Sequence, residues 1–286
     1  MIETRYYKVA GHTFGVSGEG EIFALMTNYE PFSCEGRKSD ETLFALRVGK
    51  DETVGFTEDL RQEDEGQIIV CGRTSNDNPA YEFIWCCESA GQLVCTNHYH
   101  DGQLILTGQH AKMAIDNALM VLFAQATADK NTVLFHAAVV SLEGKGYMFL
   151  GKSGTGKSTH ARLWLQHIDG TELMNDDNPV VRISNGQAVV YGSPWSGKTP
   201  CYRNVNCPLG AIVHLSQAPY NKMSKLGGIP AYAVLVASIS GQRWDESIAD
   251  GLHQTENELV SNVPMWHLEC LPDKEAATLC QMTITL

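Results

Sequence analysis

Residues 151–158 read Gly-Lys-Ser-Gly-Thr-Gly-Lys-Ser, and this arrangement of glycines before a Lys-Ser pair is typical of a phosphate-binding loop, or P-loop. Glycines let the backbone turn so sharply that successive N–H groups point at one phosphate. The lysine adds a mobile positive charge, and the hydroxyl that follows it can ligate Mg²⁺. The residues predicted to bind a nucleotide through its phosphates are Gly151, Ser153, Gly154, Thr155, Gly156, Lys157, Ser158 and Thr159.

The segments on either side of the loop have the patterns that a P-loop needs. Residues 146–150 form a short apolar run, which predicts a buried strand. Residues 158–167 carry apolar side chains at near-helical spacing, which predicts an amphipathic helix. A strand, a glycine loop and a helix in this order direct the positive end of the helix at the phosphate. This context favours a P-loop over a glycine-rich turn that contains Lys-Ser by chance.

Two adjacent carboxylates, Asp176 and Asp177, end the next predicted strand at residues 172–177. A Mg²⁺ ion that bridges nucleotide phosphates takes oxygen ligands, so one carboxylate can hold the ion or its waters. The other can accept a proton from an attacking hydroxyl. An acidic turn without a chemical role is the competing interpretation, but the P-loop upstream favours the catalytic one.

Four further residues are candidates for the same site. His136 lies on a predicted strand before the P-loop, where it is either an ordinary core residue or a neighbour of the metal and the carboxylates. The loop 192–200 carries Trp195 and Lys198, and Arg203 follows it. These three residues can form a substrate lid, in which one cation neutralises the transferred phosphoryl group. The competing interpretation is a surface loop around a packed tryptophan.

Composition and charge narrow the class of protein. The 286 residues carry a net charge of −12, which disfavours a broad surface for nucleic acid or anionic membranes. The sequence has no start resembling a signal peptide and no apolar run of membrane-spanning length. Nine cysteines, an odd number without C-x-x-C spacing, indicate reduced thiols. We therefore expect a cytoplasmic protein without nucleic-acid or membrane partners.

The sequence pattern changes near the end of its first third. Residues 1–108 contain short alternating strands between Gly, Asn, Asp and Pro clusters, which predicts a small antiparallel sheet or sandwich. A helix predicted over about 110–129 bridges the two halves. Strand 132–142 and the strand before the P-loop have hairpin spacing, so we expect them to be antiparallel neighbours. The predicted fold class is α/β, with a smaller β-rich domain at 1–108 and a P-loop kinase-like domain at 109–286.

Three segments together resemble a known catalytic core. They are Phe135-His-Ala-Ala-Val-Val, the P-loop 151–158 and Met174-Asn-Asp-Asp177. In this order they resemble HPr kinase/phosphorylase and, equally, the ATP-dependent phosphoenolpyruvate carboxykinases. Both families share one nucleotide-binding core with a P-loop and a mixed sheet, and the match covers about 131–215. The resemblance implies a phosphoenolpyruvate-carboxykinase-like P-loop core with a mixed sheet.

The resemblance also implies roles for single residues. Lys157 matches the lysine that contacts the β- and γ-phosphate oxygens, and Ser158 matches the Mg²⁺ ligand. Asp176 matches the acid/base residue of the kinases, and Asp177 matches their metal-binding residue. His136 matches either a metal ligand of the carboxykinases, which would imply Mn²⁺, or the kinase histidine that supports the base.

Departures from both families favour phosphoryl transfer to a hydroxyl. Thr159 stands where HPr kinases commonly have Glu, and no Glu-Ile-Arg-Gly-x-Gly segment is evident. The arginine- and lysine-bearing substrate motifs of the carboxykinases are not evident in this shorter chain. The layout is more similar to small kinase-like proteins of the same core, some of which phosphorylate serine on small molecules or peptides.

The sequence therefore predicts an ATP-binding, kinase-like enzyme that transfers the γ-phosphoryl group to a serine-like hydroxyl with Mg²⁺, or alternatively Mn²⁺. Two other functions stay open: a carboxykinase-like enzyme acting on oxaloacetate, and a non-catalytic nucleotide-sensing module. The expected partners are a nucleotide and a small-molecule or peptide phosphate acceptor. The sequence leaves open the identity of that acceptor, the preferred nucleotide and whether the chain forms a homo-oligomer.

Overall fold

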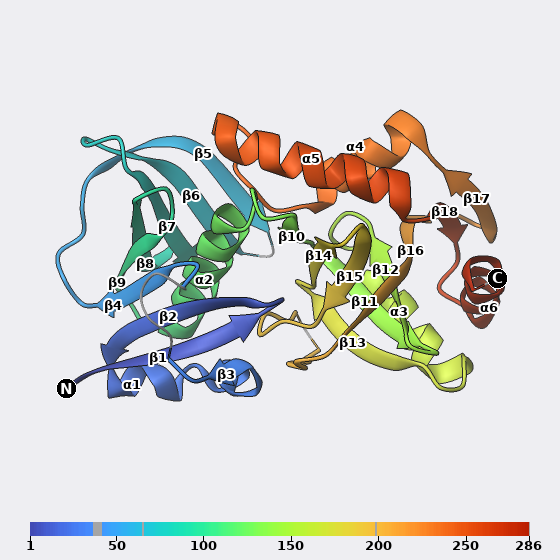
Figure 1. Ribbon diagram of the computed structural model, residues 1–286, viewed down its shortest axis with the longest axis horizontal. Coiled ribbons are helices and arrows are strands. Elements are labelled where there is room, and N and C mark those ends of the chain that lie inside the picture. The colour runs from blue at the N-terminus through green and yellow to red at the C-terminus, as the bar shows by residue number, and fades with distance from the viewer. Residues whose placement is uncertain (37–41, 65, 198, 286) are drawn as a thin grey trace. The chain divides into compact units, whose positions relative to one another are not determined.

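The computed structural model describes residues 1–36, 42–64, 66–197 and 199–285, although not the side chain of Asp64. The chain forms two compact units, unit 1 (Met1–Ala126) and unit 2 (Thr127–Leu286). Figure 1 shows the chain coloured along its length. The division between the two units falls after Ala126, and the helix that ends there belongs to unit 1.

Unit 1 is built mainly from strands. Its elements are β1 (Ile2–Val9), β2 (His12–Glu19), α1 (Gly20–Ala24), the 3₁₀ helix η1 (Thr27–Phe32), β3 (Ser33–Cys34), β4 (Ala45–Gly49), β5 (Phe56–Asp64), β6 (Gln67–Thr74), β7 (Pro79–Trp85), β8 (Glu88–Thr96), β9 (Asp101–Leu106) and α2 (Ala111–Ala126). The strands form one mixed sheet in the order β3-β1-β2-β4-β9-β8-β7-β6-β5.

The position of β4 makes this sheet mixed. β4 runs parallel to both β2 and β9, while β1 with β2 and the run from β5 to β9 pair antiparallel. The prediction of a wholly antiparallel sheet or sandwich is therefore wrong. Alternation along a segment identifies a strand, but it has the same period of two whichever way the neighbouring strand runs.

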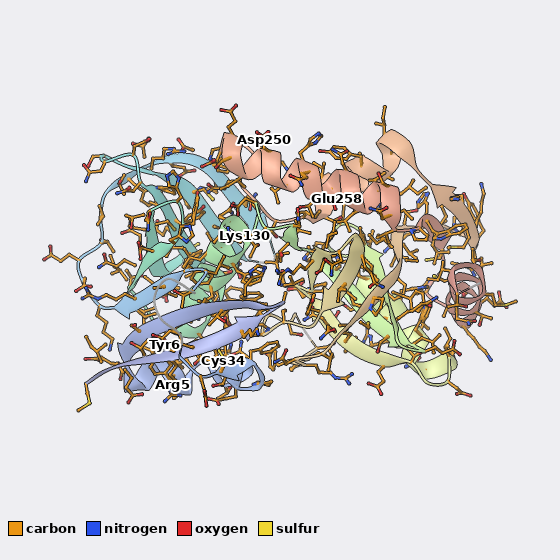
Figure 2. The ribbon with its side chains drawn as sticks, in the orientation of Figure 1. Arg5, Tyr6, Cys34, Lys130, Asp250 and Glu258 are labelled. Atoms are coloured by element: carbon orange, nitrogen blue, oxygen red, sulfur yellow. The ribbon has the colours of Figure 1, made fainter. Side chains whose placement is uncertain are left out.

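Helix α2 and aromatic side chains form the core of unit 1. The helix contacts β7, β8 and β9, and its Leu119, Leu122 and Phe123 are fully buried. Phe14 and Phe44 stack with ring centroids 4.9 Å apart. At the outer surface of β1, where Figure 2 labels Arg5 and Tyr6, the Arg5 guanidinium lies 4.3 Å from the centroid of the Phe23 ring.

Unit 2 alternates strands and helices. Its elements are β10 (Thr132–Leu134), β11 (Ala137–Leu142), β12 (Lys145–Leu150), α3 (Lys157–His167), β13 (Glu172–Asp177), β14 (Val180–Ser184), β15 (Gln187–Tyr191), β16 (Asn206–Gln217), β17 (Lys222–Leu226), α4 (Gly228–Ser238), α5 (Glu246–Asn262), β18 (Met265–Cys270) and α6 (Lys274–Ile284). The sheet has the order β10-β14-β15-β16-β12-β11-β13, and β18 adds to β16 and pairs with β17.

The centre of this sheet confirms the predicted hairpin. β11 and β12 pair antiparallel through the turn at Glu143 and Gly144, both of which have positive φ, at 50° and 76°. On its other side β12 runs parallel to β16, and β16 runs parallel to β18. Unit 2 is therefore a mixed α/β structure, as expected for the fold class.

The predicted strand 132–142 is broken at Phe135 and His136. β10 pairs with β14, whereas β11 pairs with β12 and β13. At the break, Phe135 forms an isolated bridge with Ile239, and the His136 N–H donates to the carbonyl oxygen of Ser238 at 2.8 Å. The prediction of one continuous strand is wrong, because the residue pattern of 132–142 does not show where the chain changes strand partners.

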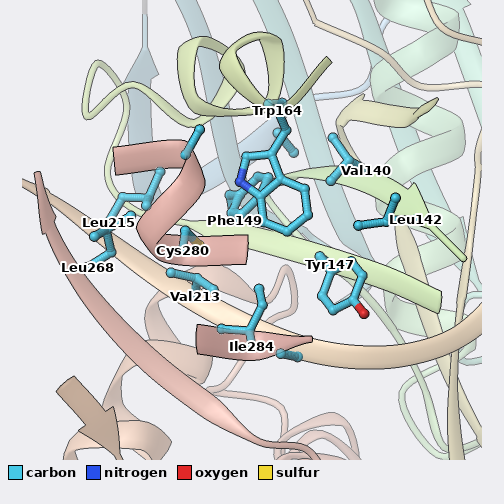
Figure 3. Packing of buried hydrophobic residues seen from close by; sticks show 14 residues of the cluster. Val140, Leu142, Tyr147, Phe149, Trp164, Val213, Leu215, Leu268, Cys280 and Ile284 are labelled. Carbon is cyan, nitrogen blue, oxygen red and sulfur yellow. The ribbon is translucent and has the colours of Figure 1, made fainter. Parts of the chain in front are cut away.

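One face of the sheet in unit 2 packs against α3 and α6. The cluster in Figure 3 joins Phe149 and Val213 of the sheet, Trp164 of α3 and Cys280 of α6, all fully buried. Helices α4 and α5 pack against each other, and α5 contacts β10 and β15. Within the described residues no helix is long and apolar enough to cross a membrane.

Candidate functional site

The loop 151–156 joins β12 to α3 and has the backbone that its glycines permit. Gly151, Gly154 and Gly156 have φ angles of 154°, 78° and 104°, in the region that residues with a Cβ rarely adopt. Gly156 is the N-cap of α3, and its carbonyl oxygen accepts the N–H of His160 at 2.8 Å. A glycine has no side chain to cap the helix, so the first N–H groups of α3 face the loop, where an anion is favoured.

Lys157 lies against the loop that precedes it. Its side chain is buried, and Nζ donates to the carbonyl oxygens of Gly151 at 3.0 Å and Lys152 at 3.4 Å. A second contact joins the loop to strand β16, because Gln217 Nε2 donates to the carbonyl oxygen of Gly154 at 3.2 Å. The Lys157 ammonium group is therefore hydrogen-bonded to the backbone of the loop, and Gln217 of β16 links the loop to the neighbouring strand.

Asp176 lies in a row of residues that crosses three strands. Asp176 pairs with Ala138 on β11, and Ala138 pairs with Phe149 on β12. Side chains paired directly across strands lie on the same face of a sheet. Since Ala138 and Phe149 belong to the cluster under α3, Asp176 lies on the face that carries the helix of the P-loop. Asp176 is buried, with 3% of its surface exposed.

Asp177 has an unusual backbone and two side-chain partners. Its φ is 136°, which is a strained conformation for a residue with a Cβ. One carboxylate oxygen lies 3.1 Å from Nδ1 of His136, and the other accepts the Asn178 side-chain amide at 2.8 Å. The break between β10 and β11 thus brings His136 to the acidic end of β13. Strain of this kind is commonly retained at functional positions.

The loop after β15 is joined to this end of β13. Ser196 forms a bridge with Asp177, and the Gly197 N–H donates to the carbonyl oxygen of Asp176 at 2.6 Å. A Cβ on Gly197 would come within 3.1 Å of the Asp177 Cβ. The end of the loop 192–197 therefore lies against the backbone of both aspartates.

Two buried polar residues that the sequence analysis missed hold this loop in place. The Asn175 side-chain amide donates to Ser193 Oγ and to the Trp195 carbonyl oxygen, both at 3.1 Å. Ser193 Oγ in turn donates to the Asn178 carbonyl oxygen at 2.6 Å. Both Asn175 and Ser193 are fully buried. An asparagine directly before the Asp-Asp pair was the only signal in the sequence, and its partner is distant along the chain.

The structure describes two of the three predicted substrate residues, Trp195 and Arg203. Trp195 is buried, with 3% of its surface exposed, so it packs in the loop and does not form an open lid. Arg203 donates to Glu172 at 2.7 Å and to the Leu173 carbonyl oxygen at 2.6 Å, at the start of β13 and away from the aspartates. In the structure Arg203 therefore forms an ion pair with Glu172, and its contact with a transferred phosphoryl group stays a prediction. Lys198 lies outside the described residues.

The donor groups at this site fit a hard divalent ion. Carboxylate and hydroxyl oxygens are the ligands that Mg²⁺ prefers, and it usually keeps several waters or substrate oxygens. Asp176 and Asp177 at the end of β13 would supply the carboxylates, and Ser158 in the first turn of α3 would supply the hydroxyl. In the described parts of the chain no three His, Cys, Asp or Glu side chains form a metal cluster. These donors therefore suit an ion shared with phosphate oxygens better than a closed, all-protein metal site.

The comparisons with known proteins found similarity among solved structures only. No protein-family model matches the sequence, and no curated protein matches it. Among solved structures, the chain is similar to the Hpr(Ser) kinase/phosphatase from Coxiella burnetii, with a TM-score of 0.32 and 13% sequence identity. The similarity covers 53% of this chain and 88% of the Coxiella chain. A TM-score of this size does not establish a common function.

Proposed function

We propose that the chain is an ATP-dependent phosphotransferase that moves the γ-phosphoryl group to a hydroxyl of a serine-like acceptor. One observation carries the proposal. Asp176 lies in the same cross-strand row as Phe149, two residues before the P-loop, and on the sheet face that α3 covers. A loop suited to phosphate and a carboxylate suited to proton transfer therefore share one edge and one face of the sheet.

Each residue has a distinct part in this proposal. The N–H groups of the loop and of the first turn of α3 bind phosphate oxygens, and Lys157 Nζ neutralises the charge that develops on them. Ser158 and Asp177 are the residues that would hold Mg²⁺, which supplies charge neutralisation when bound. His136 contacts the carboxylate of Asp177 at 3.1 Å and so fixes its orientation. Asn175 and Ser193 hold the adjoining loop.

The proposed reaction breaks one P–O bond and makes another. The bond between the γ-phosphorus and the oxygen that bridges it to the β-phosphorus breaks, and ADP leaves with the electron pair. The acceptor hydroxyl oxygen forms the new bond to phosphorus, and its proton passes to the Asp176 carboxylate. Burial of Asp176 excludes bulk water from this carboxylate. The acceptor that best fits this chemistry is a primary alcohol such as a serine side chain or free serine.

The experiment that tests the proposal incubates the full chain with γ-labelled ATP, Mg²⁺ and a panel of hydroxyl acceptors. The panel contains free serine, serine-bearing peptides and small alcohols. We expect label on one acceptor class, with no transfer by the Asp176→Asn chain. A parallel assay with oxaloacetate follows phosphoenolpyruvate formation. Tight ATP binding with no transfer to any acceptor and no phosphoenolpyruvate would replace the proposal with the nucleotide-sensing function.

A further inference from the structure

Asp176 and Asp177, at the end of β13, lie to one side of strand β12 in the sheet. β11 and β13 follow it in the sheet on that side, and β16 and β18 follow on the other. On the proposed function, a triphosphate in the P-loop directs its γ-phosphate toward Asp176. The nucleoside end of the same molecule then extends in the opposite direction, over the ends of β16 and β18.

The end of β16 borders the P-loop directly. Leu150, the last residue before the loop, pairs with His214 of the parallel strand β16. The carbonyl oxygen of Leu215 lies 3.2 Å from where a Cβ on Gly151 would stand. Gln217 then reaches the Gly154 carbonyl oxygen at 3.2 Å. Any group that leaves the loop on this side meets the last residues of β16 first.

Two histidine rings face each other at this edge of the sheet. His214 pairs across the strands with His267 of β18, and their ring centroids are 5.3 Å apart with planes tilted by 29°. Nε2 of His267 lies 2.8 Å from Oγ of Ser216. All three side chains are half-buried, so they are accessible from solvent. Since Val213 and Leu268 pack under α3, the rings lie on the opposite face of the sheet.

The environment of these rings suits an aromatic, uncharged ligand. Burial, together with the neighbouring His267, lowers the pKa of His214 below its usual value, which favours the neutral imidazole. Flat neutral rings stack on nucleobases, and stacking tolerates different bases because each has a π face. The Ser216 hydroxyl and the imidazole nitrogens add donors and acceptors for the base edge or the ribose.

We propose that His214, His267 and Ser216 form the subsite for the nucleoside part of the nucleotide whose phosphates the P-loop binds. The stacked imidazoles contact the base, and the end of β16 lies between this subsite and the phosphate loop. The inference deepens the proposed function and depends on it, because it assumes that a nucleotide occupies the loop in that direction.

The test compares two ligands that share phosphates and differ in the nucleoside. Calorimetric titrations use Mg-ATP and Mg-tripolyphosphate with the unchanged chain, His214→Ala, His267→Ala, Lys157→Ala and the control His167→Ala. His167 is exposed at the end of α3 and lies outside the proposed subsite. We expect His214→Ala and His267→Ala to weaken ATP binding roughly 5- to 150-fold, the range that loss of one stacking side chain produces. Tripolyphosphate binding stays unchanged in both.

The outcomes distinguish a failure of the subsite proposal from a failure of the proposed function. Unchanged ATP binding in both histidine variants overturns the subsite and leaves the phosphotransferase proposal standing if Lys157→Ala still loses both ligands. If the histidine variants bind ATP and tripolyphosphate equally weakly, the subsite is also overturned. The substitutions would then disturb the phosphate loop and not a contact with the nucleoside. Full ATP binding by Lys157→Ala, or no binding of either ligand by the unchanged chain, overturns the proposed function and the subsite with it. His214→Phe, which keeps a stacking ring, is expected to retain ATP binding.

Discussion

The backbone N–H of Gly197 donates a hydrogen bond to the carbonyl oxygen of Asp176 at 2.6 Å. This bond fastens the loop after β15 to the acidic end of β13, although the two segments are separated along the chain by a complete hairpin. The contact leaves little space, because a Cβ on Gly197 would meet the Asp177 Cβ at 3.1 Å and the Asp176 carbonyl oxygen at 3.3 Å. The position of both aspartates thus depends on a residue without a side chain.

Gly197→Ala is expected to lower phosphoryl transfer more than it lowers stability. The added methyl must displace the loop or the strained backbone of Asp177 by a few tenths of an ångström, and misplacement on the scale of 1 Å costs about 100-fold in rate. The comparison is Gly55→Ala, where an added Cβ has no neighbour within 4 Å. Transfer rates and urea midpoints of both variants check the prediction, and equal rates for the two would contradict it.

Lys157→Ala is expected to weaken Mg-ATP binding by at least tenfold. The ammonium group makes charge-assisted hydrogen bonds in this loop, and each such bond contributes about 1.5–3 kcal/mol. Lys152→Ala is the matched control, because that lysine is in the same loop with an exposed side chain. Calorimetric titration measures both. A dissociation constant for Lys157→Ala equal to that of the control would show that the loop does not bind phosphate in the proposed way.

Substitutions of Asp176 and Asp177 are expected to impair different steps of phosphoryl transfer. Asp176→Asn removes the proton acceptor, so nucleotide binding persists while transfer falls about 10²- to 10⁴-fold, the usual contribution of a general base. Asp177→Asn removes a proposed metal-binding carboxylate, so the Mg²⁺ concentration for half-maximal transfer should rise. Single-turnover transfer over a Mg²⁺ series measures both effects. Exchanged behaviour of the two variants would reverse the roles assigned here.

Ser193→Ala is expected to destabilise unit 2. The hydroxyl is fully buried and contacts Asn178, Trp195 and Asn175, so its removal leaves buried polar groups unpaired at a cost of about 1–3 kcal/mol. Ser184→Ala, at an exposed strand end, provides the comparison and should change the free energy of unfolding by less than about 0.5 kcal/mol. Urea denaturation measures both. Similar values for the two variants would show that the Ser193 bonds contribute little.

His160 is expected to make the fold sensitive to mild acid. Burial lowers the pKa of His160 to about 4, against about 6.5 in an unfolded chain. Between these values the unfolded state binds more protons, so this contribution to stability is present above pH 6.5 and is lost as the pH falls toward 4. The loss amounts to about 3 kcal/mol at most.

The contribution of His160 to the pH dependence of the free energy of unfolding is isolated by comparing the unchanged chain with His160→Gln. Carboxylates also titrate in acid, so only the difference between the two chains reports on this residue. The free energy of unfolding, measured by urea denaturation from pH 7.5 to 4.5, should fall more steeply in the unchanged chain. Parallel profiles would mean that His160 is protonated without difficulty in the folded state.

Local patterns predicted the elements around the site well. The run 172–177 and the hairpin before the P-loop appear as strands in the structure, and the helix after the loop begins at Lys157. These features depend on residues close in sequence, such as glycines with positive φ and alternating apolar side chains. The roles assigned to the P-loop residues, to both aspartates and to His136 remain predictions until nucleotide and metal binding are measured.

Long-range pairing could not be predicted from the same patterns. The parallel position of β4 in unit 1 and the break between β10 and β11 both depend on which strand becomes a neighbour. The partners of Arg203 were missed for the same reason, since Glu172 lies far from it in sequence. Asn175 and Ser193 read as ordinary polar residues until the fold buries them together.

The N-cap of helix α3 is Gly156, a residue that cannot cap the helix with a side chain. With glycine as the N-cap residue, the helix N-terminus is less stable by roughly a few tenths of a kcal/mol than one with a side-chain cap, and a bound anion can take the place of the cap. A ligand that binds only the folded chain adds RT ln(1 + [L]/Kd) to its stability. If phosphates serve as that substitute cap, the supply of nucleotide around the protein sets how well it survives heat and proteases, quite apart from any turnover.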